Sequence, residues 1–145
     1  MQNMEISTHY LPYIKKTLIV LTNNESAKIL LAFERELVEL ETLTMKAEHA
    51  GKRATDPSLA FPPDSDEAKA HVRKELFAKL SRKLLKMLKA EAQELILCAP
   101  EVNKNELVAA MHADVGAVMV ELVPKNLASL PLDHVIRILQ ETRAD

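Results

Sequence analysis

The second half of the chain alternates between short apolar runs and longer stretches with helical spacing, and this alternation constrains the fold most. Residues 94–99 (ELILCA) and 117–123 (AVMVELV) have the length and composition of buried strands. Residues 103–115 form a predicted helix between them, and Pro131 lies in the first turn of a final helix. Consecutive strands joined through a helix pair in parallel with right-handed crossovers, so the sequence predicts a parallel part of a sheet.

The first half of the chain predicts three more strands, at residues 17–23, 27–33 and 37–45. The first is an unbroken run of aliphatic and β-branched residues, which is typical of a buried central strand. A short link between the second and third indicates a hairpin. Residues 65–92 then form the longest predicted helix, with leucine or valine at every fourth position from Val72 to Leu88.

The predicted order βββαβαβα is that of an α/β domain with a mixed five-stranded sheet and helices on both faces. This order matches the ribonuclease-H-like arrangement. We expect residues 1–16 to be an N-terminal extension and residues 17–143 to be a single α/β domain, which suits a chain of 145 residues. Residues 46–64 contain three of the seven prolines and predict one long loop.

Composition excludes several classes of protein. No apolar run approaches the ~20 residues that a membrane span needs, and the first 16 residues lack the pattern of a signal peptide. The single cysteine, Cys98, forbids an intrachain disulfide and favours a reducing compartment, so we expect a cytoplasmic protein without a membrane span. The net charge of −2 argues against a global polycation, although it allows a local basic face.

The sequence indicates no cofactor, no metal site and no catalytic group. The only two glycines, Gly51 and Gly116, exclude a glycine-rich phosphate loop. Cys98 lies in an apolar strand and is expected in the core, because an activated thiolate needs an open, electropositive setting. Glu67, His71 and Glu75 recur along one side of the long helix. Such a row fits a metal or proton-transfer site, but far more often it is a solvated charge ladder.

Several stretches resemble the bacterial family named for "protein required for attachment to host cells". In the second half these are a strand that ends in Ala99 and Pro100 and leads into a helix, and a strand that leads through residues 125–131 (KNLASLP) into the last helix. Residues 17–33 resemble the family's opening hairpin, with Asn23 and Asn24 at the positions where the family has an acidic residue followed by glycine. Together these stretches cover most of residues 17–139.

The resemblance implies kinship with the middle domain of archaeal and eukaryotic peptide chain release factors, and hence a link to ribosomes or tRNA. Two departures limit what is carried over. The catalytic Gly-Gly-Gln tripeptide of release factors has no counterpart, and the Gly- and His-rich stretch of many relatives is reduced to residues 51–68. The resemblance therefore implies a related fold without peptidyl-tRNA hydrolysis.

The carboxyl ends of the predicted parallel strands form a candidate ligand edge, because ligands of open α/β sheets bind there. The polar residues that would meet at this edge are Asn23, Asn24, Glu101, Lys125 and Asn126. Too few carboxylates are present to hold the two metals of a nuclease. Asn23 and Asn24 are better explained as residues that end a strand through side-chain hydrogen bonds to the backbone.

One flank of the long helix is a candidate RNA-binding surface. Residues 65–92 contain eight basic and four acidic residues, a net charge of +4. Five of the basic residues share one flank beside the apolar stripe, a flank that is interrupted mainly by Glu75: Lys79, Arg82, Lys83, Lys86 and Lys89. This stripe can neutralise phosphates of rRNA or tRNA. The ordinary alternative is a solvent-exposed helix face, whose lysines near the carboxyl end stabilise the helix by interacting favourably with its dipole.

Three hypotheses follow from the sequence. The first is a non-catalytic, release-factor-like α/β module that binds a ribosome or RNA through the basic flank. The second is a protein-interaction or homo-oligomeric module that uses the exposed edge of the hairpin strand. The third is a small hydrolase or nuclease that works at the strand ends near Asn23 and Lys125.

Overall fold

The computed structural model describes residues 3–45, 65–90 and 92–144, without the side chains of residues 143 and 144. The long loop that we expected at residues 46–64 lies outside the described residues, as does the acidic residue Glu91 near the end of the long helix.

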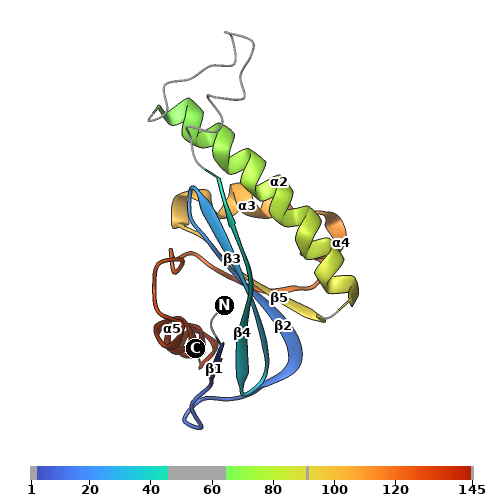
Figure 1. The fold of residues 1–145 in the computed structure, drawn as a ribbon, viewed down its shortest axis with the longest axis vertical. Helices are drawn as coiled ribbons and strands as arrows, with labels where there is room; N and C mark the ends of the chain where they lie inside the picture. The colour runs from blue at the N-terminus through green and yellow to red at the C-terminus, as the bar shows by residue number, and fades with distance from the viewer. Residues whose placement is uncertain (1–2, 46–64, 91, 145) are drawn as a thin grey trace.

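Four strands precede the long helix (Figure 1): β1 (Asn3–Glu5), β2 (Tyr13–Thr22), β3 (Ser26–Glu34) and β4 (Glu36–Thr44). The helix itself is α2 (Asp66–Ala90), and Ser65 caps it by accepting a hydrogen bond from the Ala68 amide at 3.1 Å. The remaining elements are β5 (Glu94–Cys98), the 3₁₀ turn η2 (Glu101–Asn103), α3 (Lys104–Ala110), α4 (Ala113–Gly116), β6 (Met119–Val123) and α5 (Leu132–Ala144).

The strands form one mixed sheet in the order β1-β4-β3-β2-β5-β6. β2, β3 and β4 pair antiparallel, while β5 pairs in parallel with β2 and with β6. The hairpin between β3 and β4 turns at Glu34, which has a φ of 55°. The predicted mixed α/β fold and the predicted parallel pairing are therefore confirmed.

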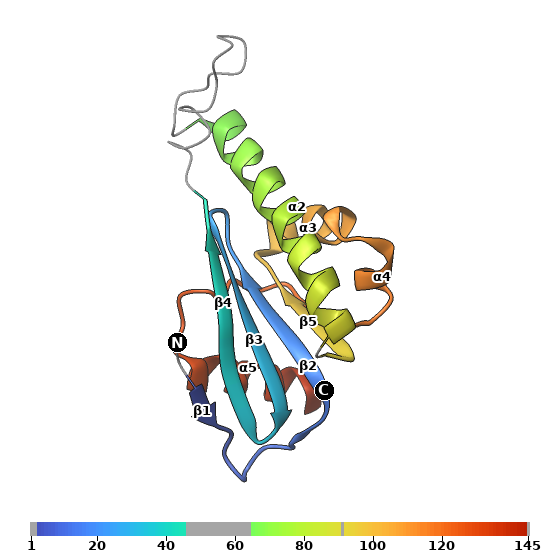
Figure 2. The same ribbon diagram turned by 45° about the vertical axis from the view of Figure 1, so that its right-hand side comes forward.

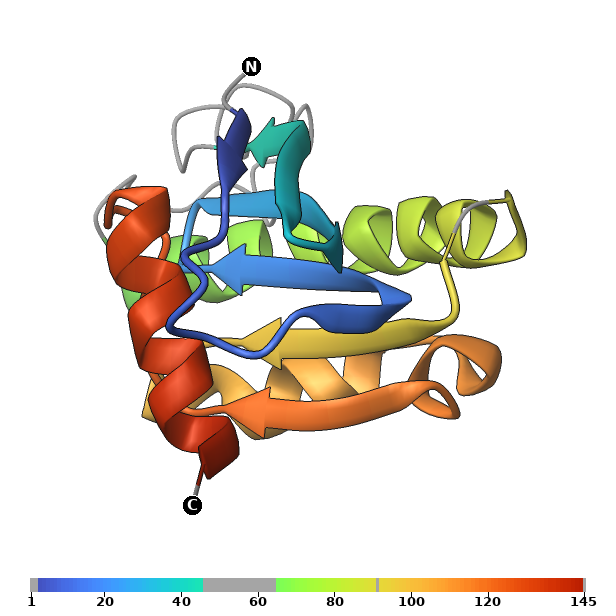
Figure 3. The ribbon, with the colours of Figure 1, turned by 90° about the horizontal axis from the view of Figure 1, so that it is seen from below.

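Helices cover both faces of the sheet, as predicted. Figure 3 shows α5 on one side of the strands and α2 and α3 on the other. α2 lies alongside the sheet, and its first turns extend past the ends of β3 and β4 (Figure 2). Each face has its own hydrophobic core, which we call the first core on the side of α2 and the second core on the side of α5.

β2 supplies both cores because successive side chains of a strand point to opposite faces. Leu18 and Val20 lie in the first core, and Ile19 and Leu21 lie in the second. All four side chains are completely buried. The unbroken apolar run that predicted a central strand is thus explained by burial on both sides.

Within the described residues the sheet has six strands, where the sequence predicted five. The additional strand, β1, belongs to the segment expected to be an N-terminal extension, and it pairs antiparallel with residues 36–38 of β4. A three-residue strand is too short to show an alternating pattern, so no periodicity indicated it. Ile6, directly after β1, is buried in the second core and anchors this segment.

The helix predicted at residues 103–115 is two helices. Met111 leaves the helical conformation with φ −79° and ψ 139°. The next amide, of His112, donates to the Ser81 hydroxyl of α2 at 2.8 Å, and the His112 side chain accepts from the Asp114 amide at 3.0 Å to begin α4. Because α2 supplies the acceptor at this break, the local sequence could not indicate it.

We expect truncation of Leu80 in α2 to destabilise the domain strongly. Its side chain is completely buried in the first core, and Leu→Ala changes at such sites cost about 2–5 kcal/mol. The matched control is Lys79→Ala, one position away on the exposed face, with an expected effect within about 0.5 kcal/mol. Urea denaturation followed by circular dichroism measures both, and equal effects would contradict the assignment of these faces.

Candidate nucleic-acid interface

The five basic side chains predicted on one flank of α2 line a single open hollow of about 500 Å³. Leu85 completes its lining. We call this surface the basic groove; its residues are Lys79, Arg82, Lys83, Leu85, Lys86 and Lys89. All five basic residues that the sequence placed on this flank therefore line one hollow.

The groove follows from the two-faced pattern of α2. Leu76, Leu80 and Leu84 are completely buried against the sheet, which fixes the rotation of the helix about its axis. The basic positions recur at intervals of three and four residues, so they follow one another along a neighbouring flank. From Lys79 to Lys89 the flank extends for about 15 Å at the usual rise of 1.5 Å per residue.

Among the described residues, only one of the five cations of the groove has an acidic partner. Lys83 pairs with Glu41 of β4, with 2.9 Å between the ammonium and carboxylate groups. For the other four basic residues, Lys79, Arg82, Lys86 and Lys89, the described part of the chain provides no ion pair, and all four are exposed. By contrast, Arg73 in the first half of α2 pairs with Glu106 of α3 at 2.7 Å. The groove therefore offers four cationic groups to an anionic partner.

A second hollow adjoins the basic groove, and the sequence pattern did not indicate it. It has a volume of about 480 Å³, and Lys89 lines both hollows. We call it the terminal hollow because it lies at the carboxyl end of α2. Its lining is Ile14 and Lys16 of β2, Phe33 of β3, and Leu88, Lys89, Ala90, Ala92 and Gln93. These residues come from three separate parts of the chain, so only the folded structure unites them.

The candidate ligand edge is also formed, since β2, β5 and β6 run in parallel and end together. In the register of the sheet, Leu21 is opposite Cys98, and Cys98 is opposite Val123. Asn23 and Asn24 follow β2, Glu101 follows β5, and Lys125 and Asn126 follow β6. Thr22 joins the first two of these ends by donating to the Cys98 carbonyl at 2.9 Å.

Several polar side chains at this edge already stabilise local turns. The Asn23 side-chain oxygen accepts from the amides of Glu25 and Ser26, at 2.8 and 2.7 Å, which confirms that Asn23 ends its strand through backbone hydrogen bonds. Asn126 accepts from the Ala128 amide at 3.3 Å. Glu101 forms an ion pair with Lys104 at 2.8 Å. These contacts compete with any ligand for the same groups.

The row of Glu67, His71 and Glu75 contains a local contact between two of its side chains. The His71 imidazole lies 2.9 Å from the Glu75 carboxylate, one helical turn away, and His71 is exposed. Within residues 3–45, 65–90 and 92–144, no three His, Cys, Asp or Glu side chains are grouped so that they could hold a metal ion.

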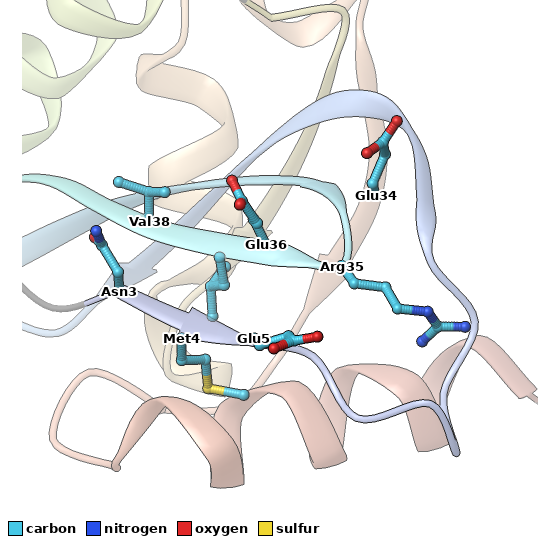
Figure 4. Close-up of a pocket in the computed structure, with 8 residues that line it drawn as sticks. Asn3, Met4, Glu5, Glu34, Arg35, Glu36 and Val38 are labelled. Atoms are coloured by element: carbon cyan, nitrogen blue, oxygen red, sulfur yellow. The ribbon is translucent and has the colours of Figure 1, made fainter.

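A hollow of about 680 Å³ lies between β1 and the β3–β4 turn (Figure 4). Glu5, Glu34 and Glu36 give its rim an acidic character. Arg35 reaches toward the segment that follows β1 (Figure 4), where its guanidinium group donates to the carbonyls of Ser7 and Tyr10 at 2.9 and 2.8 Å. The arginine therefore fastens the N-terminal segment, and the acidic rim does not suit an anionic ligand.

Cys98 is a core residue, as predicted. Its side chain is completely buried in the second core. Burial raises the pKa of the Cys98 thiol far above its usual value, and the Glu121 carboxylate raises that pKa further. The thiol therefore remains protonated at neutral pH and cannot act as a nucleophile.

We expect Cys98 to be unreactive toward a disulfide reagent such as dithionitrobenzoate in the native protein at about pH 8. The reagent cannot reach the buried sulfur, and the thiolate fraction is negligible. In concentrated guanidinium chloride one thiol per chain should react rapidly, since the chain has one cysteine. Rapid labelling without denaturant would show that β5 is more accessible than the structure indicates.

None of the helices that the structure describes is long and apolar enough to cross a membrane.

A family model described as bacterial archaeo-eukaryotic release factor family 12 matches residues 16–139. No curated protein matches the chain in sequence. The predicted kinship with archaeal and eukaryotic release factors is thereby confirmed. None of the comparisons bears on attachment to host cells.

Solved structures with a similar fold include an archaeal protein with a TM-score of 0.53 at 15% identity, over 86% of this chain and 34% of that one. The archaeal translation termination factor aRF1 has a TM-score of 0.52 at 15% identity, over 88% and 40% of the two chains. The ethanolamine utilization protein EutJ from Carboxydothermus hydrogenoformans has a TM-score of 0.50 at 12% identity, over 83% of this chain and 48% of that one. The chain thus spans less than half the length of each, and at these identities the likeness concerns the fold alone.

Proposed function

Because the chain belongs to bacterial archaeo-eukaryotic release factor family 12, we propose that it is a release-factor-like α/β module that binds ribosomal RNA or tRNA through the basic groove. The proposal excludes peptidyl-tRNA hydrolysis, since a chain whose only glycines are Gly51 and Gly116 has no Gly-Gly-Gln tripeptide. A ribosomal partner would place its action in the cytoplasm.

The observation that carries the proposal is the local excess of unneutralised positive charge. The whole chain has a net charge of −2, yet Lys79, Arg82, Lys86 and Lys89 lie exposed along one flank of one helix, without ion pairs in the described part of the structure. A helix face that needs only solubility commonly mixes both signs of charge. A flank with an excess of positive charge attracts the phosphates of a nucleic acid and releases their counterions on binding.

The other hollows suit RNA less well. The hollow beside β1 has an acidic rim, which repels phosphates. The candidate ligand edge has polar groups of both signs, and Asn23, Glu101 and Asn126 are engaged in local contacts. The proposal therefore assigns RNA binding to the basic groove and no activity to the strand ends.

We expect the purified protein to co-sediment with ribosomes at low salt and to be released as the salt concentration increases. Exchange of two groove cations in Arg82→Gln/Lys86→Gln should reduce the bound fraction. It should also lower the slope of log affinity against log salt by about two, roughly one for each lost phosphate contact. Sedimentation across a salt series measures both quantities.

The matched control is Lys69→Gln/Lys74→Gln, which removes the same charge from exposed positions in the first half of α2, outside the groove. It should leave the bound fraction and the slope close to those of the unaltered protein. Equal losses in the two double variants would show that net charge alone governs binding. Absence of the unaltered protein from ribosomal fractions at low salt would refute the proposal.

One structural observation keeps the homo-oligomeric alternative open. β1 covers the outer edge of β4 only at residues 36–38, so residues 39–44 have no outer partner strand among the described residues. An exposed edge of this kind can pair with the same edge of a second chain. Light scattering tests this alternative, because an oligomer has a multiple of the chain mass of 16.2 kDa. The change Thr42→Pro blocks pairing at the edge, so this variant should have the mass of a single chain.

A further inference from the structure

The terminal hollow differs in chemistry from the basic groove that it adjoins. The groove is lined almost wholly by cations, whereas the hollow combines apolar side chains with two lysines, Lys16 and Lys89. Ile14, one of its lining residues, is 86% exposed and so offers apolar surface to a ligand. Among its described lining residues none is acidic. A ligand for this hollow therefore has an apolar surface and carries negative charge.

The hollow contains an aromatic side chain, whereas the residues that line the basic groove include none. Phe33 of β3 is partly exposed, and the Lys16 ammonium group lies 5.8 Å from the centre of its ring. At this distance a cation is attracted by the face of the ring. Lys16 is an exposed, flexible side chain, so it can exchange this contact for one with a phosphate.

The backbone around the hollow fixes its shape. The pairing of β2 with β3 is irregular between Tyr13 and Thr17, and residues 14–16 are exposed there. The Gln93 amide donates to the Lys16 carbonyl at 2.8 Å, which ties the segment after α2 to the start of β2. The volume of about 480 Å³ falls in the range of roughly 300–1,000 Å³ that is common for sites of small organic groups.

We propose that the terminal hollow holds an unpaired base of single-stranded RNA by stacking on Phe33, while the adjoining phosphates contact Lys16, Lys89 and the basic groove. Base stacking on an aromatic side chain beside a basic track is the common way to bind single strands without sequence preference. A paired base in a duplex cannot enter, because its faces are covered by its neighbours. This inference rests on the proposed function and extends it to the class of RNA.

The test uses a short single-stranded RNA that contains one 2-aminopurine and a fluorophore, with a duplex RNA of equal length as comparison. We expect the unaltered protein to bind the single strand and to quench 2-aminopurine. Phe33→Leu should weaken single-strand binding by at least about fivefold and abolish the quenching, with duplex binding unchanged. Phe33→Tyr keeps the ring and should restore both readouts. Arg82→Gln/Lys86→Gln should weaken single-strand and duplex binding together.

The outcomes separate this inference from the proposed function. If the unaltered protein binds RNA without quenching, or if Phe33→Leu binds the single strand as tightly as before, the inference is wrong and the proposed function stands. If the unaltered protein binds neither RNA nor ribosomes, both are wrong. Circular dichroism of Phe33→Leu checks its fold, and the quenching by the unaltered protein decides the question even if that variant does not fold.

Discussion

Burial of β2 on both faces dictates how the other elements are arranged. Its residues 18–21 contribute alternately to the two cores, and its two edges pair with β3 and β5. A strand that is apolar on both faces must be shielded from water on both faces of the sheet, so it requires a helix layer on each side. α2 supplies one layer and α5 the other, and the sheet continues outward from β2 in both directions. The parallel partner β5 also brings the ends of β2, β5 and β6 to one edge.

The long helix α2 serves two purposes that its geometry keeps apart. One face buries Leu76, Leu80 and Leu84 against the first core, and a neighbouring flank exposes the cations of the basic groove. Because the buried face fixes the rotation of the helix, the direction in which the groove faces is determined as well. The ion pair between Lys83 and Glu41 joins the helix to β4. The other groove cations are available to solvent or to a partner. An exposed ion pair of this type adds little to stability.

The family and the fold place this chain near translation termination factors, but they do not transfer an activity to it. The chain covers 40% of the archaeal factor aRF1, with 15% identity. The 145-residue sequence contains no Gly-Gly-Gln tripeptide, and at the strand ends the Asn23 and Asn126 side chains stabilise local turns. Function on a shared fold resides in particular sites. In this chain the surface that we propose for phosphates is the basic groove, and the hollow that adjoins it contains an aromatic ring.

The mixed α/β fold, the central strand, the long amphipathic helix and its basic flank could be predicted from the sequence, because each of these depends on local periodicity and composition. The sequence did not reveal β1, whose three residues are too few for a pattern, or the break at Met111, which depends on a hydroxyl group from α2. Ile14, Lys16 and Phe33 meet the end of that flank only in the folded chain. Residues distant in sequence become neighbours through strand pairing and packing, and periodicity within one segment contains no information about such contacts.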